Sequence, residues 1–138
     1  MAYKGRNVVY GFLVWLIPFA VSFMAFPLLA VDYSFPFNTL MIVVGGITGV
    51  ALLVNYFRRV TQYHLSEGIA VGVTWFVINV ALDLVVLIPA TTALNQGQTL
   101  EPWQVLTYAN YFPRIGLRYL LIPITAIGFG FALRRRQA

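Results

Sequence analysis

Cysteine is absent from this chain of 138 residues, and charged side chains make up only 9% of it. Without cysteine there is no disulfide, no thiol nucleophile and no thiolate metal site. The single histidine, His64, cannot form a bis-histidine haem site within one chain, and we expect it to be a solvated loop residue. Motifs for hydrolysis, phosphate binding and metal ligation are also missing. The sequence therefore predicts a protein without catalytic activity, cofactor or metal.

Apolar side chains, by contrast, make up 60% of the chain, far more than a soluble domain of this size carries. They gather in four runs, each close to the roughly 20 residues that cross a bilayer. The runs lie at about residues 8–30, 37–57, 68–89 and 113–133. We predict a single all-α domain, residues 1–138, folded as a four-helix transmembrane bundle with up-down-up-down topology. An aromatic-rich segment at about residues 100–112 predicts a short interfacial helix before the fourth span.

The basic residues predict the orientation of this bundle. Two of the nine, Arg114 and Arg118, begin the fourth span at one end. The other seven fall at the opposite end: Lys4, Arg6, Arg58, Arg59, Arg134, Arg135 and Arg136. Under the positive-inside rule this asymmetry predicts a multi-pass protein of the inner or plasma membrane with both termini in the cytoplasm. The net charge of +5 then reflects topology and contact with the lipid bilayer, and nucleic acid is not an expected partner.

A carboxylate, Asp83, interrupts the third apolar run. A charge inside a membrane is costly, so it needs a partner or a function. Asp83 lies six residues before Pro89, about 9 Å from that helix end, and Arg118 enters from the same side to a similar depth. We expect the two residues to form an ion pair that joins the third span to the fourth. The alternative is that Asp83 is a proton or cation site on a pathway.

Small and polar residues share one face of the predicted third span. Steps of three or four residues place Gly68, Gly72, Phe76, Asn79 and Asp83 on one stripe. We expect this stripe to face protein or water, with glycines in close helix contact and the Asn79 amide donating to Asp83.

Two further groups are candidate contact sites. Gly45, Gly46 and Gly49 form a GxxxG pattern in the second span, which favours close helix packing. We expect the packing partner to be another helix of the same chain in preference to a helix of a second copy. Arg114 and Tyr111 are candidates for contact with an anion or a lipid head group. For Arg114 we favour the simpler interpretation, in which its side chain snorkels to the head-group layer or meets Glu101 or Asp32.

Two segments resemble a group of small uncharacterised prokaryotic four-span integral membrane proteins: EGIAVGVTWFVINVALDLVVLIP (residues 67–89) and YFPRIGLRYLLIPITAIGFG (residues 111–130). The resemblance lies mainly within residues 67–130 and includes Asn79, Asp83 and Tyr119. The resemblance implies the four-span fold and implies no particular activity. Two functions stay open: a structural or accessory protein that self-associates or joins a larger membrane complex, and a small oligomeric channel or transporter with Asp83 as its proton- or cation-sensitive group.

Overall fold

The computed structural model describes residues 3–29, 35–97, 99 and 105–135, and its regular elements within those residues are all helices. Four helical stretches are long and apolar enough to cross a membrane. They span Gly5–Ala25, Thr39–Phe57, His64–Leu94 and Gly116–Arg134. The chain is therefore a multi-pass helix bundle of the membrane type, as the four apolar runs predict.

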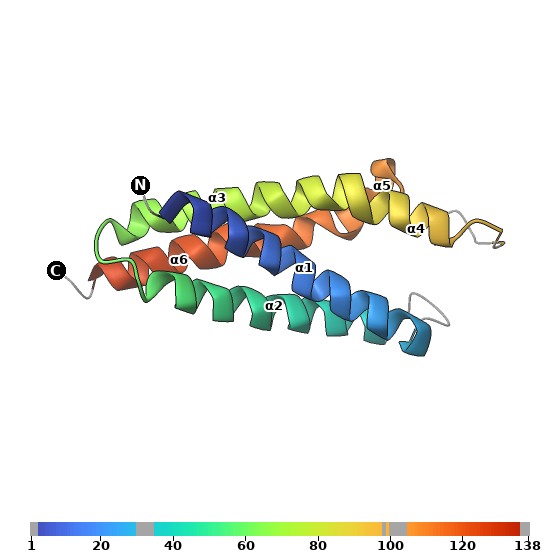
Figure 1. Cartoon of the computed structure of the whole chain (residues 1–138), viewed down its shortest axis with the longest axis horizontal. Helices are drawn as coiled ribbons and strands as arrows, with labels where there is room; N and C mark the ends of the chain where they lie inside the picture. The colour runs from blue at the N-terminus through green and yellow to red at the C-terminus, as the bar shows by residue number, and fades with distance from the viewer. Residues whose placement is uncertain (1–2, 30–34, 98, 100–104, 136–138) are drawn as a thin grey trace.

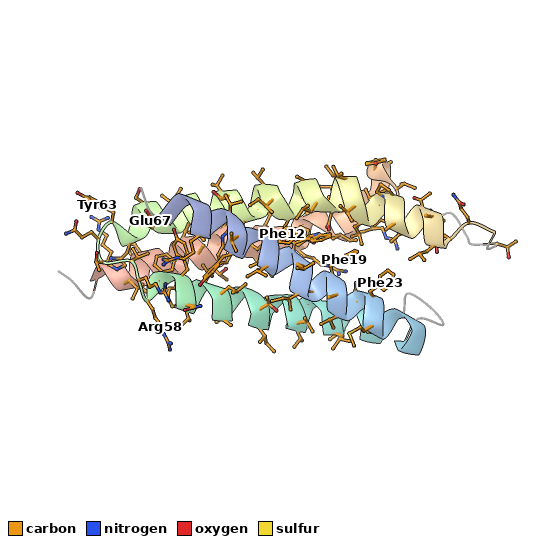
Figure 2. All side chains as sticks on the ribbon, in the orientation of Figure 1. Phe12, Phe19, Phe23, Arg58, Tyr63 and Glu67 are labelled. Carbon is orange, nitrogen blue, oxygen red and sulfur yellow. The ribbon has the colours of Figure 1, made fainter. Side chains whose placement is uncertain are left out.

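The long helices are α1 (Tyr3–Leu29), α2 (Phe35–Phe57), α3 (His64–Leu82) and α6 (Leu121–Arg135). Figure 1 shows that α1 begins, α2 ends, α3 begins and α6 ends at the same end of the bundle. We call this end, which includes the α2–α3 loop, the α2–α3 end. Arg58 and Tyr63 project away from the bundle there, and Tyr63 is 78% exposed (Figure 2).

Large apolar side chains cover the outside of the helices. Val73 and Val77 of α3 are 53% and 55% exposed, and Ile47 of α2 is 67% exposed. In water such a surface would drive aggregation, whereas lipid tails solvate it without cost. The exposed faces thus agree with the membrane class that the helix lengths indicate.

All four long helices contribute to the packed core, but α2 does so mainly through its last turns. α3 packs along α6, and α1 crosses α3 at the α2–α3 end before it runs beside α2 (Figure 1). α2 packs mainly on α1 and meets α6 only weakly. A buried cluster fills the α2–α3 end, where Val71 and Trp75 are fully enclosed beside Tyr56, Phe57 and Ala126.

Glycines on α3 and α6 allow these two helices to approach closely. A Cβ atom added to Gly68 would lie 2.6 Å from the Ala126 carbonyl oxygen, and one added to Gly72 would lie 2.7 Å from the Pro123 Cα. From the other side, a Cβ on Gly130 would overlap the His64 carbonyl oxygen. The close packing expected of Gly68 and Gly72 is present.

The glycines of α2 behave differently. A Cβ atom added to Gly45, Gly46 or Gly49 would meet no atom of the described chain within 4 Å. The preferred interpretation of this GxxxG pattern, close packing within the chain, is therefore wrong for the described residues. The reason is that α2 follows α1 away from α3 and α6, so none of the described helices lies against this face.

The third span is longer than predicted at both ends. It continues from α3 through a π-helical turn, η1 (Asp83–Leu87), into α4 (Ile88–Leu94). Pro89 has no backbone N–H, and the Ile88 N–H bonds to the Asp83 carbonyl five residues back. The helix therefore widens before Pro89 instead of ending there.

His64 begins this span instead of lying in a solvated loop. It is 7% exposed, and its Nε2 lies 3.0 Å from the Val60 carbonyl oxygen. The expectation of a solvated histidine is wrong because Tyr63, at φ 57°, turns the chain so that the helix starts at His64 itself.

The fourth span also differs at its start. A short helix, α5 (Tyr108–Arg114), contains Pro113, and a 3-10 turn, η2 (Gly116–Leu120), leads into α6. The spanning stretch begins at Gly116, because the chain breaks from helical geometry at Ile115. Of the predicted interfacial helix, residues 100–104 lie outside the described residues, and its end forms part of α5.

Candidate functional site

Asp83 lies at the centre of a hydrogen-bond cluster in the half of the bundle away from the α2–α3 end. Its Oδ1 accepts a 2.7 Å bond from Trp15 Nε1. Its Oδ2 accepts bonds from the hydroxyls of Tyr119, at 2.8 Å, and Tyr111, at 3.0 Å. Asp83 is 1% exposed. The three donors come from α1, η2 and α5, and Asp83 itself lies in η1, so hydrogen bonds to one carboxylate connect four elements.

These donors suit a carboxylate. An indole N–H can only donate, and each phenol can donate one proton to the charged oxygen. Burial, and then the nearby Asp83 carboxylate, raise the pKa of Tyr111 above its ordinary value, so its hydroxyl stays protonated at neutral pH. Charge-assisted hydrogen bonds of this kind compensate part of the cost of taking a carboxylate out of water.

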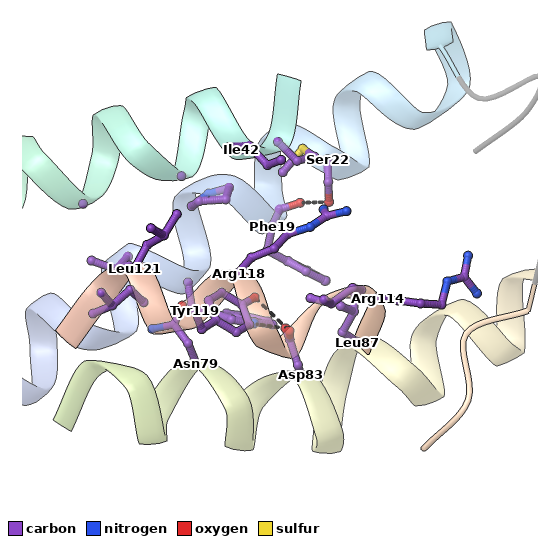
Figure 3. A pocket seen from close by; sticks show the side chains of 18 of the residues that line it. Phe19, Ser22, Ile42, Asn79, Asp83, Leu87, Arg114, Arg118, Tyr119 and Leu121 are labelled. Atoms are coloured by element: carbon purple, nitrogen blue, oxygen red, sulfur yellow. Dashed lines mark hydrogen bonds between the residues drawn. The ribbon is translucent and has the colours of Figure 1, made fainter. Parts of the chain in front are cut away.

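The structure gives Asp83 neutral donors where the sequence suggested an arginine. Figure 3 shows the Arg118 side chain extending away from Asp83, across a cavity, towards Ser22 of α1. Both Asp83 and Arg118 line that cavity. Neutral donors stabilise the carboxylate without burying a second full charge beside it, which would add its own desolvation cost.

Sequence reasoning missed these donors for a physical reason. Trp15 is 68 residues from Asp83 and Tyr111 is 28 residues away, so neither shares a helix face with it. The only available indication was that indole and phenol groups inside a membrane need acceptors, and that Asp83 is an acceptor.

Asn79 is buried beside this cluster but does not bond to Asp83 as expected. Its Nδ2 donates to the Trp75 carbonyl oxygen at 2.8 Å and to the Gly11 carbonyl oxygen at 3.3 Å. Its Oδ1 has no hydrogen-bond partner in the described part of the chain, although Asn79 is 1% exposed. Gly68, Gly72, Asn79 and Asp83 of the predicted stripe are thus buried and Phe76 is half-buried, but the Asn79 amide donates to backbone carbonyls.

Tyr111 and Arg114, the residues predicted to contact an anion or a lipid head group, lie in different surroundings. Tyr111 is 2% exposed and directs its hydroxyl at Asp83, so it is not placed for a head group. Arg114 Nη1 donates to the Val105 carbonyl oxygen at 3.1 Å. Only Arg114 of the pair retains access to the cavity, which its side chain helps to line.

The cavity itself has a volume of about 790 Å³ and separates α1 and α2 from the other helices. This volume lies within the roughly 300–1,000 Å³ of small-molecule sites. Most of its wall is apolar, and Gly45, Gly46 and Gly49 of α2 form part of it. The main polar groups are Ser22, Asn79, Asp83, Thr91, Arg114 and Arg118.

The cavity is blocked towards the α2–α3 end. The residues that fill that end, Tyr56, Phe57 and Trp75, belong to the packed cluster and not to the cavity wall. Trp75 Nε1 also donates to the Asn7 carbonyl oxygen at 3.0 Å, which fixes α1 against α3 there. The packed cluster therefore bounds the cavity at the α2–α3 end, and Val14 belongs to both the cluster and the cavity wall.

No group of three or more histidine, cysteine, aspartate or glutamate side chains that could hold a metal occurs among the described residues. No protein-family model, curated protein or solved structure matches the chain. Its class, a multi-pass helix bundle with a cavity beside a buried carboxylate, therefore rests on the chain's own structure.

Proposed function

We propose that this protein is a small, non-catalytic membrane transporter whose substrate site is the cavity and whose ion-sensitive group is Asp83. The observation that carries the proposal is the cavity of about 790 Å³, which is lined in part by a buried carboxylate and is bounded at the α2–α3 end by the packed cluster. A channel needs a continuous path, whereas alternating access requires a site that is open towards one side at a time. The packed cluster at the α2–α3 end supports a transporter over a channel.

We further propose an orientation for the transporter. Arg6, Arg58 and Arg59 belong to the α2–α3 end, and Arg134 and Arg135 end α6 at the same end. The positive-inside rule supports an arrangement in which the protein lies in a prokaryotic cell membrane and both termini face the cytoplasm. In this orientation the end of the cavity that the packed cluster bounds faces the cytoplasm.

A second candidate function is a structural or accessory role in a homo-oligomer or a larger membrane complex. The observation in its favour is the open glycine face of α2, at Gly45, Gly46 and Gly49. Small residues allow a helix of a second chain to approach closely in lipid. In this case the cavity would be filled by protein instead of substrate.

Native mass spectrometry of the purified protein with retained lipids separates the two candidates. Gly49→Leu fills part of the cavity, and Gly128→Leu is its matched control, because Gly128 is equally open but lies outside the cavity wall. We expect wild type and Gly128→Leu to retain a small amphipathic molecule that Gly49→Leu loses. If Gly49→Leu instead converts an oligomer or complex to the free monomer, the transporter proposal fails and the accessory role stands.

A further inference from the structure

We infer that the cavity binds an amphipathic organic anion, whose carboxylate or phosphate head is held by Arg114 and Arg118 and whose apolar chain runs towards the packed cluster. This inference rests on the proposed function, since it assigns a substrate class to the same cavity. Both arginines line the cavity, and both are only half-buried, so each side chain retains accessible surface.

The charges in the cavity wall favour an anion. Among the described residues that line the cavity, Arg114 and Arg118 are the cations and Asp83 is the anion, which leaves one positive charge in excess. Asp83 is 1% exposed and already accepts three hydrogen bonds, so it offers little surface to a ligand. The other acidic residues expected near Arg114, Asp32 and Glu101, lie outside the described residues. A charged group that enters the cavity therefore meets the arginines in preference to the carboxylate.

The arginine side chains have donors that suit a carboxylate or a phosphate. A guanidinium group carries five N–H donors in a planar fork, which matches two oxygens of such an anion. Arg114 Nη1 donates to the Val105 carbonyl oxygen at 3.1 Å, a bond that positions this side chain and uses one of its donors. Figure 3 shows both guanidinium groups beyond Asp83, on the side away from Asn79. The two positive charges thus lie towards the same end of the cavity.

The position of the arginines in the chain indicates where the charged head lies. The fourth span begins at Gly116, so Arg114 precedes the span and Arg118 lies in its first turn. From Leu121 onwards, α6 continues towards the α2–α3 end. A charged head at the level of the arginines stays near the membrane surface, where a charge costs less than at the bilayer centre.

The wall nearer the packed cluster indicates an apolar chain. It includes Val14 of α1, Gly49 of α2 and Ile122 of α6. Val14 belongs to the packed cluster as well, so the cavity ends there against apolar side chains. An inorganic anion bound at the arginines would leave most of the roughly 790 Å³ unfilled. An alkyl chain attached to the anionic head would fill this space and be shielded by the apolar wall.

The test uses the full chain in phosphatidylcholine nanodiscs, labelled with 5-fluorotryptophan and observed by ¹⁹F NMR. Trp15 lines the cavity, so its resonance reports on a ligand there, whereas Trp75 lies in the packed cluster and serves as the internal reference. The probes are octanoate, octyl phosphate, octanol and octylammonium, which share one chain length and differ in the charge of the head. Phosphatidylcholine has no net charge, so the bilayer supplies no anionic competitor.

We expect octanoate and octyl phosphate to shift the Trp15 resonance saturably and to bind at least about tenfold more tightly than octanol, the difference that charge-assisted hydrogen bonds support. Octylammonium should bind more weakly than octanol. Arg114→Gln should remove most of the preference for anions. Arg58→Gln should retain it and is the matched control, because it removes the same charge at an exposed position outside the cavity wall.

Each contrary outcome has a definite meaning. Equal affinity for anionic, neutral and cationic probes would overturn anion recognition while leaving the cavity as a binding site. A preference for anions that Arg58→Gln removes as fully as Arg114→Gln would overturn it too, since the net charge of the protein would then account for the preference. No saturable shift with any probe would overturn the proposed function as well. The comparison of probes uses the wild-type chain, so it does not depend on any variant folding.

An anionic lipid in the nanodisc distinguishes two sources of the ligand. If phosphatidylglycerol competes with octanoate for the Trp15 shift, the anion is the head group of a bilayer lipid. If octanoate binds equally well in its presence, the anion is a smaller solute. Either result supports the two arginines as the anion site.

Discussion

The two ends of the bundle use the same small residue in opposite ways. At the α2–α3 end, Gly68 and Gly130 bring α3 and α6 into backbone contact. Towards the other end, Gly45 and Gly49 of α2 line a cavity and touch no neighbouring helix of the described chain. Gly68 with Gly72, and Gly45 with Gly49, have the four-residue spacing that favours close helix packing. What decides between a contact and a cavity is the path of the neighbouring helices.

The path of α1 accounts for the difference. At the α2–α3 end α1 is fixed to both neighbours: Trp75 donates to the Asn7 carbonyl oxygen, and Arg6 Nη2 donates to the Tyr56 carbonyl oxygen at 3.2 Å. Further along, α1 leaves α3, and Trp15 makes the bond to Asp83. Beyond this point α1 and α2 form one wall of the cavity. The packed end is stabilised mainly by close apolar packing. The cavity end depends on the Asp83 hydrogen bonds and on a smaller apolar cluster of Ile88, Leu106 and Tyr111.

The largest expected effect on stability comes from substituting a glycine at the packed end, compared with a glycine at the cavity end. Gly68→Leu should lower the free energy of unfolding by about 3 kcal/mol, because its side chain would collide with backbone of α6 that cannot move aside. Gly49→Leu should change the free energy by less than about 0.5 kcal/mol, since its side chain enters open space. Reversible unfolding in mixed micelles, followed by circular dichroism, measures both. Equal losses would show that the two glycine faces are packed alike.

The next effect concerns the polar cluster of the cavity end. Asp83→Leu should cost about 2–3 kcal/mol, because it leaves the indole N–H of Trp15 and two buried phenols without their acceptor. Asp83→Asn should cost about 1 kcal/mol, since the amide oxygen still accepts one bond and the phenol oxygens can accept from its NH₂. The same unfolding assay applies. A fully neutral Asp83→Leu would mean that packing alone holds this end together.

A double-mutant cycle identifies the partner of Asp83. Tyr119→Phe should cost about 1.5 kcal/mol, because it removes a hydrogen bond to a buried charge. Combined with Asp83→Asn, it should show a coupling of about 1 kcal/mol. The pair Asp83→Asn and Arg118→Gln should couple by less than about 0.5 kcal/mol, since the Asp83 oxygens bond to neutral donors. If Arg118→Gln recovered the stability lost in Asp83→Asn, the result would support the Asp83–Arg118 ion pair that the sequence predicts.

The sequence predicts the features that depend on one helix, and it does not predict those that depend on how the helices are arranged around the cavity. The four apolar runs and the stripe from Gly68 to Asp83 are local patterns of hydropathy and helical period. The structure has four apolar spans, and it buries the residues of that stripe except the half-buried Phe76. The partner of Asp83 and the cavity depend on the angle at which α1 and α2 leave the other helices. No local pattern encodes this angle. Pro89 illustrates the limit, because a proline that predicts a helix end here produces a wider turn.

The smallest expected effect tests whether polar bonds matter less at the packed end. The Tyr56 hydroxyl donates to Glu67 Oε2 at 2.9 Å, and its ring packs edge-on against Tyr10 and Phe57. Tyr56→Phe keeps the ring contacts and loses only a partly buried hydrogen bond, so it should cost about 0.5–1 kcal/mol. Measured beside Tyr119→Phe in one unfolding series, it should be the milder change. The reverse order would mean that this hydrogen bond, and not the shape of the core, holds α2 against α3.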